Sequence, residues 1–264
     1  MDYATIGYEK TNSIATITLN RPDNMNTFSI EMLNELVSVL EMVTLDDDIR
    51  AVIITGEGRA FSAGADIKGV EGMLGLQKEL PETQDILKMI VRVVIAIRQV
   101  PKPVIAALNG VVAGGAANIV LACDLVISSE KARMAQNFIN IGLVPDGGGT
   151  YFLPALIGYQ RTAEIFFTGK ILTAQEAFDL GLYNRVVPPE ELMSAARELA
   201  DELAQKPTAA IAAGKAVLNR ETIPALRLYL EDEARTQRRM VATHDAKEGM
   251  TAFLEKRKAK FIGK

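Results

Sequence analysis

The sequence predicts an α/β fold with a mostly parallel sheet, followed by a helical C-terminal segment. Strand-like and helix-like segments alternate along most of the chain, a β-branched run suits a buried strand, and strand patterns end near residue 189. Strands that alternate with crossover helices form mostly parallel sheets. We therefore expect a core at 1–188 and a helical oligomerisation segment at 189–264.

The elements of the predicted core follow in order. Residues 14–19 alternate apolar and polar side chains, as a half-buried strand does, and residues 51–55 form a continuous run that suits a fully buried strand. Apolar side chains recur at helical spacing over 29–43, and Ser29 is a candidate N-cap. The same pattern predicts a helix at 82–97, a strand at 104–108, a helix that begins near Gly115 and a strand at 125–128.

The C-terminal part of the sequence has only helical patterns. We expect helices, several of which begin at proline, at 189–203, 207–218, 224–241 and 245–256. Apolar side chains in this part need a surface to pack on, and another subunit is one such surface. Examples are Leu226, Leu228 and Met240.

Composition restricts the class of protein. A hydrophobic share of 48% and a charged share of 23% indicate a compact enzyme or binding protein rather than a disordered chain. The net charge of -4 does not indicate a nucleic-acid partner. One cysteine, Cys123, and one histidine, His244, allow neither an intramolecular disulfide nor a zinc-type cluster, so we expect no metal site. His244 lies in a polar segment and is expected at the surface.

The sequence shows no pattern typical of targeting or membrane insertion. The N-terminal residues lack the profile of a signal peptide or a transit peptide. The uncharged stretch 103–123 is long enough to span a membrane, but its proline, asparagines and glycines favour a buried strand, turn and helix. We therefore expect a cytoplasmic protein with no membrane partner.

The sequence has two glycine-containing turns, and the second lies between an apolar strand and the start of an apolar helix. They are FSAGAD at 61–66 and the paired glycines Gly114 and Gly115. Glycine lets backbone amides approach a ligand closely, and amides at a helix N-terminus carry partial positive charge. Each turn can therefore donate one N–H to a single developing oxyanion, and two such donors would polarise a thioester carbonyl. Tight turns without a ligand are the alternative.

Five ordered segments resemble the crotonase, or enoyl-CoA hydratase/isomerase, superfamily. They are LNRPDNMN at 19–26, FSAGADIK at 61–68, NGVVAGGAANIVLACD at 109–124, GLVPDGGGT at 142–150 and KEGMTAFLEKRKAKF at 247–261. The resemblance covers essentially the whole chain at the family's spacing. It implies a crotonase-type spiral of repeated ββα units, and homotrimers, often paired into hexamers, that assemble through the helical segment.

The resemblance also implies an acyl-CoA site. Ala65 and Gly115 match the oxyanion-hole pair, whose backbone N–H groups hold the thioester oxygen. Lys68 matches a position near the adenine end of coenzyme A, which enters as part of the substrate and not as a separate cofactor. Phe253 and Lys256 match residues by which a C-terminal helix contacts the nucleotide. The substrate-binding residues expected in all are Ala63, Asp66, Ile67, Lys68, Asn118, Phe138, Phe253 and Lys256.

Two carboxylates of the family's hydratases are missing. Their positions are occupied by Asn118 and Phe138. An amide can hold a water by hydrogen bonds but cannot take a proton near neutral pH, and a phenyl ring can do neither. Conventional hydration of an enoyl-CoA, which needs a positioned water and proton delivery, is therefore not expected.

One aspartate remains as a candidate acid or base. Asp146 matches the catalytic aspartate of certain enoyl-CoA isomerases, and an N-cap role for the predicted helix at 149–156 is the alternative. One base suffices to move a proton from C2 to C4, so the resemblance implies an isomerase of fatty acid metabolism that converts a 3-enoyl-CoA to a 2-enoyl-CoA. An atypical hydratase, a hydrolase, a decarboxylase and a non-catalytic acyl-CoA binder or RNA-associated homologue remain alternatives.

The remaining acidic residues have structural or unassigned roles. Asp124 is expected to cap or anchor the next strand in the core, and Asp66 to stabilise its own turn. Glu71, Glu79 and Glu82 lie in a Met-rich and Leu-rich segment that borders the expected acyl pocket, and the sequence assigns them no role.

Overall fold

Two sheets form the body of the molecule. The computed structural model describes residues 3–66 and 81–264. The larger, six-stranded sheet has the order β1-β2-β3-β5-β7-β10, with strands Ile6–Thr11, Ile14–Leu19, Ala51–Gly56, Val104–Leu108, Leu125–Ser129 and Arg185–Val187. The smaller has the order β4-β6-β8-β9, with strands Ala60–Ser62, Val111–Ala113, Arg133–Ala135 and Ile171–Thr173. Only β1 with β2 and β8 with β9 pair antiparallel among these strands.

The two sheets are built together, one strand of each at a time. β3, β5 and β7 of the larger sheet are followed directly by β4, β6 and β8 of the smaller one, and helices connect successive pairs. Parallel pairing of β3 with β5 and of β4 with β6 stacks each unit on the previous one. The chain therefore forms a spiral of ββα units, as expected from the resemblance.

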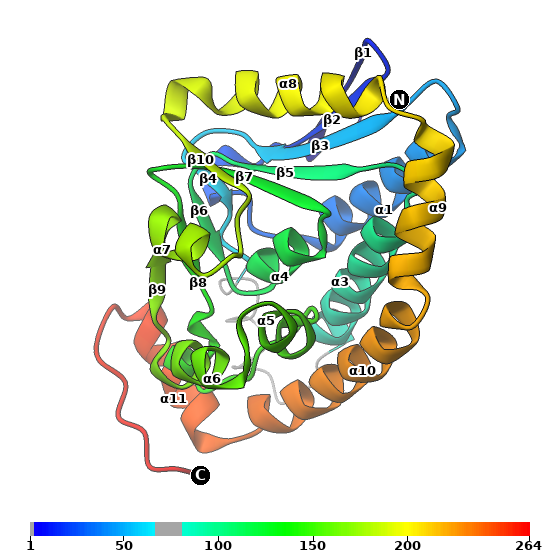
Figure 1. Cartoon of the computed structure of the whole chain (residues 1–264). Helices are drawn as coiled ribbons and strands as arrows, with labels where there is room; N and C mark the ends of the chain where they lie inside the picture. Colours follow the sequence, from blue (N-terminus) through cyan, green and yellow to red (C-terminus); the bar gives the residue numbers. More distant parts are fainter. Residues whose placement is uncertain (1–2, 67–80) are drawn as a thin grey trace.

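Helices cover both faces of the larger sheet. α1 (Ile30–Leu45), α3 (Pro81–Gln99) and α4 (Gly115–Ala122) lie on one side and α8 (Leu192–Ala204) on the other (Figure 1). Ala196 and Ala200 of α8 pack on Ile53 in one buried cluster. The prediction of a half-buried strand at 14–19 is wrong for this reason, because α8 covers the face that would otherwise contact water.

The predicted helices are present with shifted bounds. Ser29 caps α1 by accepting a hydrogen bond from the Met32 amide at 3.1 Å, which confirms the N-cap. A 3-10 turn at 189–191 precedes α8, and α10 begins before Pro224. The remaining helices are η1 (Pro22–Asn24), η2 (Asn137–Ile141), α5 (Gly149–Ile157), α6 (Tyr159–Thr168), α7 (Ala174–Asp179), η3 (Pro189–Glu191), α9 (Thr208–Asn219), α10 (Thr222–Val241) and α11 (His244–Leu254).

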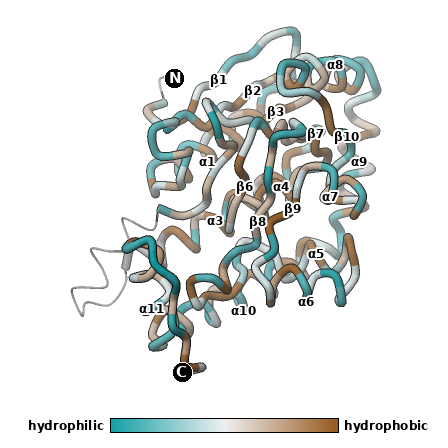
Figure 2. The backbone as a smooth tube through the Cα atoms, turned by 90° about the vertical axis from the view of Figure 1, so that its left-hand side faces the viewer, coloured by the Kyte–Doolittle hydropathy of each residue, from teal (hydrophilic) through white to brown (hydrophobic). Residues whose placement is uncertain are grey.

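The C-terminal helices pack on the body of the same chain. Figure 2 shows α8 at one end of the molecule and α10 with α11 at the other. Leu226 of α10 is 0% exposed, so this side chain needs no second subunit to cover it. Val217, Leu218 and Leu228 are 73%, 76% and 65% exposed. The trimer or hexamer, which would cover such positions, stays a prediction, as does the boundary at residue 188.

The uncharged stretch 103–123 forms β5, β6 and α4, as predicted. Within residues 3–66 and 81–264, the search found no helix with the length and apolar character that a membrane crossing requires.

Candidate active site

The small sheet brings the two glycine turns together. β4 and β6 are parallel neighbours, so the turns that follow them lie at the same edge. The Phe28 amide donates to the Gly64 carbonyl at 2.8 Å and anchors the first turn. Gly64 has a φ of +86°, and a Cβ there would lie 2.6 Å from the Ala113 carbonyl oxygen. Glycine is therefore required both for the backbone conformation and for the close contact between the turns.

The second turn starts α4 and presents a helix N-terminus. Gly114 is the N-cap with a φ of 57°, and Gly115 is the first helical residue. The amide of a first helical residue has no acceptor within its own helix. Ala65 and Gly115 both line one cavity. The structure thus brings the predicted oxyanion pair to a common site.

This cavity is a largely apolar pocket of about 410 Å³ between the two turns and the C-terminal helices. Its walls include Ile90 of α3, Phe138 of η2, Val241 of α10 and Met250 of α11. Asp146 is the one ionisable residue that lines it among the residues the structure describes. A carboxyl group in an apolar, partly closed pocket is a typical acid-base arrangement.

The Asp146 carboxyl group has one bonded and one unbonded oxygen. Its side chain is buried, and Oδ2 accepts from Gln237 Nε2 at 3.2 Å, whereas Oδ1 has no hydrogen-bond partner among the residues the structure describes. A Cβ placed on Gly115 would lie 3.0 Å from Oδ1, so this oxygen faces the second turn. Burial, helped by the charge of Glu233 and opposed by the Gln237 bond, raises the pKa of Asp146 to about 7.

The N-cap alternative for Asp146 is wrong. The N-cap residue of α5 is Gly148, with a φ of 91°, and it has no side chain to cap the helix. Among the described residues, the Asp146 carboxyl bonds Gln237 through Oδ2 and makes no bond to an amide of this helix. The carboxyl group is therefore available to a ligand in the cavity that Asp146 lines.

Two residues of α10 hold the loop that carries Asp146. Glu233 accepts from the Gly148 amide at 2.7 Å and from the Thr150 amide at 2.9 Å, and also bonds the Thr150 hydroxyl. Gln237 accepts from the Val144 amide at 3.1 Å. Both side chains are buried.

Glu233 and Gln237 were not predicted from the sequence, although a signal exists. Both lie in the buried stripe of α10, in register with Leu226, Leu230 and Val241. Polar residues that interrupt an apolar stripe at helical spacing must find buried partners. Here the partners come from the loop at 144–150.

Asn118 and Phe138 have different places. Phe138 lines the cavity, as expected for a substrate contact. Asn118 is 0% exposed and is not among the lining residues. Its Nδ2 donates to the Asp146 carbonyl oxygen at 2.5 Å, and its Oδ1 accepts from Gln136 Nε2 at 2.6 Å. The prediction that Asn118 contacts substrate is not supported by this geometry, because its polar atoms are used within the protein.

The predicted residues of the first turn divide into two groups. Ala63 lines the cavity beside Ala65. Asp66 is not among the lining residues, and one of its carboxylate oxygens lies 4.0 Å from Arg21 Nη2. The predicted binding residues Ile67 and Lys68 lie outside the described residues, as do Glu71, Glu79 and the side chain of Glu82.

Phe253 and Lys256 lie at the end of α11. Phe253 lines the cavity from the same chain and is 54% exposed, whereas Lys256 follows the helix and is not a lining residue. A Cβ on Gly249 would lie 2.6 Å from the Ile141 carbonyl carbon, so α11 packs tightly on η2. This packing places Phe253 at the cavity wall, and contact with a nucleotide stays a prediction.

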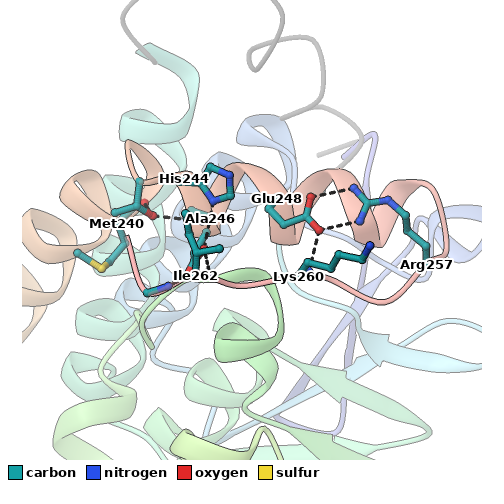
Figure 3. A network of polar contacts seen from close by, with 10 residues as sticks. Met240, His244, Ala246, Glu248, Arg257, Lys260 and Ile262 are labelled. Atoms are coloured by element: carbon teal, nitrogen blue, oxygen red, sulfur yellow. Dashed lines mark hydrogen bonds and ion pairs between the residues drawn. The ribbon is translucent and has the colours of Figure 1, made fainter.

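The C-terminal residues fold back along α11. Figure 3 shows Arg257 bound to both oxygens of Glu248, at 2.6 and 2.8 Å, and the Lys260 amide bound to the same carboxylate. Asp245 accepts from the amides of Ile262 and Gly263. These bonds hold the last residues beside the helix. The exposed His244 pairs with Asp245 at 3.2 Å, so the expected surface position is confirmed.

The family model described as Enoyl-CoA hydratase/isomerase matches residues 9–264. The chain belongs to the enoyl-CoA hydratase/isomerase family, within the crotonase superfamily. It is 33% identical over 264 residues to a trans-2-decenoyl-[acyl-carrier-protein] isomerase of Streptococcus mutans, and 36% identical over 265 residues to a crotonyl-CoA hydratase of Syntrophomonas wolfei. Each alignment covers 100% of both chains.

Solved structures show the same fold for this family member. A crystal structure of an enoyl-CoA hydratase from Mycobacterium avium subsp. paratuberculosis superposes with a TM-score of 0.88 at 31% identity. That superposition covers 99% of this chain and 100% of the other. The chain is thus an acyl-CoA enzyme of the hydratase/isomerase type with a crotonase fold. The relatives carry both hydratase and isomerase names.

Proposed function

We propose that this chain is an enoyl-CoA isomerase that converts a 3-enoyl-CoA to a 2-enoyl-CoA. The observation that carries this proposal is the Asp146 carboxyl, the one ionisable group that lines the described part of the cavity, with Oδ1 unbonded beside Gly115. A pKa raised to about 7 allows one group both to take and to return a proton near neutral pH.

The proposed reaction uses backbone groups and one side chain. The thioester oxygen accepts hydrogen bonds from the Ala65 and Gly115 amides, which stabilise the negative charge of a dienolate. Asp146 removes the proton from C2, the C3–C4 double bond shifts to C2–C3, and the protonated Asp146 delivers the proton to C4. The enzyme ends in its starting ionisation state, so no second acid or base is required.

The site favours isomerisation over hydration. Hydration requires a water held next to C3, and the two positions that carry glutamates in hydratases contain Asn118 and Phe138. Asn118 is bonded to Asp146 and Gln136, and Phe138 has no polar atom to hold a water. Relatives named hydratase nevertheless make hydration the reaction against which the proposal must be tested.

The proposed substrate is an acyl thioester with an uncharged acyl group. Ile141, Leu143, Val241, Met250 and Phe253 line the cavity, and burial of apolar surface favours an apolar acyl chain. Coenzyme A is the proposed carrier of the acyl group. The enzyme is proposed to assemble into a trimer or hexamer, as the family resemblance implies. Because the Streptococcus mutans relative is named for an acyl-carrier-protein substrate, each acyl group should be assayed on both carriers.

The experiment compares isomerisation of a 3-enoyl-CoA with hydration of crotonyl-CoA, and repeats both with Asp146→Asn. We expect isomerisation to be faster in the parent, and isomerisation and C2 proton exchange in deuterated water to fall together by roughly 100- to 10,000-fold in the variant. Acyl-CoA affinity should change little because the backbone amides remain. Asp201→Asn, an exposed change on α8, is the matched control.

Two results would contradict the proposal. Hydration in the parent that equals or exceeds isomerisation would identify a hydratase. Near-parental isomerisation by Asp146→Asn would show that Asp146 is not the proton shuttle, while the family and the thioester site would stand.

A further inference from the structure

The proposed base is held from two elements that are distant in the sequence. From α4, Asn118 donates to the backbone carbonyl of Asp146, and from α10, Gln237 donates to Oδ2 of its side chain. Gln237 and Asp146 are separated by 91 residues. One bond holds the backbone of Asp146 and the other holds its side chain. Oδ1 is left without a partner among the described residues.

The acidic side chain of Glu233 binds the same loop, and its charge influences the ionisation of Asp146. It lies one helical turn before Gln237 on α10, is 5% exposed, and accepts the amides of Gly148 and Thr150 on the C-terminal side of Asp146. Two carboxyl groups that share a buried site disfavour each other's ionised form. Gln237 has the opposite effect, because a donor to a carboxylate stabilises the charged form.

No other charged group in the described surroundings faces Asp146. α3 contributes Ile90, α4 contributes Gly115 and Asn118, and η2 and α11 line the cavity with Phe138, Met250 and other uncharged residues. The neighbours of Asp146 on its own loop, Pro145 and Gly147, carry no charge. Apart from burial, the groups that influence its charge state in the described structure therefore come from α10.

We propose that Glu233 and Gln237 are positioning residues of the active site, which together set the orientation of the Asp146 carboxyl and its charge state. This inference rests on the proposed function for its catalytic meaning, because it assigns Asp146 as the base. In this arrangement Gln237 holds Oδ2, so that Oδ1 is the oxygen that takes the C2 proton. Glu233 disfavours the ionised carboxylate, so that Asp146 is a stronger base toward the C2 proton.

The test uses two isosteric substitutions with opposite expected effects. Glu233→Gln removes the neighbouring charge, and Gln237→Glu replaces the donor by a second acidic group. The Asp146 carboxyl is titrated by carbon-13 NMR, and its resonance is assigned by its loss in Asp146→Asn. We expect the pKa to fall by roughly one unit in Glu233→Gln and to rise by roughly one unit in Gln237→Glu. The acid limb of the kcat/KM profile should move in the same directions.

Matched controls separate these effects from general changes in charge. Glu231→Gln lies on the exposed side of α10, and Gln205→Glu lies at the exposed end of α8. Neither should move the titration. Gln237→Glu leaves the bonds from Glu233 to the loop in place, so it tests the inference even if Glu233→Gln does not fold.

The outcomes distinguish this inference from the proposed function. An Asp146 titration unchanged in Gln237→Glu, or shifted in the same direction in both variants, would overturn the positioning role. Opposite shifts with unimpaired isomerisation by Asp146→Asn would support the positioning role and reject the proposed reaction. Opposite shifts in both the NMR titration and the kcat/KM profile would support both.

Discussion

Two aspartates of this enzyme, the partly buried Asp124 and the buried Asp146, have opposite surroundings. Asp124 accepts from the Val104 amide at 2.8 Å and from Lys215 Nζ at 2.6 Å, and Lys215 also donates to the carbonyls of Ile97 and Lys102. Asp146 is bonded by the neutral Gln237 and lies near the acidic Glu233. A buried charge is normally paired. Asp124 follows this rule, and Asp146 does not. Asp124 is bonded to the start of β5, whereas the sequence predicted that it would cap or anchor the next strand, β7.

The difference shows how a fold separates structural carboxylates from reactive ones. Lys215 neutralises Asp124 and ties α9 to the start of β5, so this pair holds elements together. Among the described residues no cation lies against Asp146, its ionised form is disfavoured, and its unbonded oxygen faces the turn at Gly115. Perturbed carboxyl groups in cavities are typical of acid-base catalysts. Each of the following predictions tests this contrast by a different change.

The largest effect on stability is expected for Lys215→Met. This change leaves the Asp124 carboxylate in a largely buried position without its cation, and loss of one partner of such a pair costs about 3 to 5 kcal/mol. Urea denaturation measures the free energy of unfolding. Asp146→Asn, measured alongside, should show no comparable loss at pH 7. Equal losses in the two variants would remove the distinction between the sites.

The second prediction concerns the pH dependence of stability. The pKa of Asp146 is about 7 in the folded chain against a reference value of 3.8, so the folded state binds this proton more tightly than the unfolded state. The stability that this proton contributes is therefore lost as the pH rises from about 3.8 to about 7, and little more is lost above the folded pKa. Between pH 5 and pH 8 the parent should lose stability relative to Asp146→Asn by more than about 1.4 kcal/mol, the equivalent of one pKa unit.

Denaturation of both proteins at several pH values gives this difference directly. If the difference in unfolding free energy between the two proteins is constant from pH 5 to pH 8, Asp146 titrates normally. Asp146 and Asp124 would then differ only in their hydrogen bonds.

The smallest effect is expected for Ser29→Ala, which is far from both aspartates. Loss of the N-cap bond to the Met32 amide should lower the free energy of unfolding by about 1 kcal/mol. Turnover should stay at the parental level when assayed well below the melting temperature. A clear loss of activity would mean that modest destabilisation alone reduces turnover, and the Asp146 results would need correction for it.

Much of the fold could be predicted from local patterns. β3 and β5 are apolar runs, and α1 has helical spacing and a side-chain cap. The second sheet could not be predicted in this way, since its strands β4, β6, β8 and β9 have 3 residues each. Such strands are too short to show a period. Burial of β2 on both faces also required α8, which lies far along the chain.

The site shows the same division. The turns with Ala65 and Gly115 and the Asp146 loop are local motifs, and the structure brings all three to one cavity. Asn118 was predicted as a substrate contact, because only its place in the motif was known. Its bonds to Asp146 and Gln136 exist because three segments meet in the folded core. They are α4, the loop that carries Asp146 and the end of β8, which Gln136 follows.

The sequence by itself determined the order of the core elements and the two glycine turns. It also showed that Asp146 is present and that the two glutamate positions of hydratases hold Asn118 and Phe138 instead. These features depend on local sterics, such as the positive φ of Gly64, and on residue identity. Only the tertiary structure decided the environment of Asp146. Its pKa depends on burial and on Glu233 and Gln237, which come 87 and 91 residues later in the chain. Desolvation and charge act through space, and spacing along the chain does not report them.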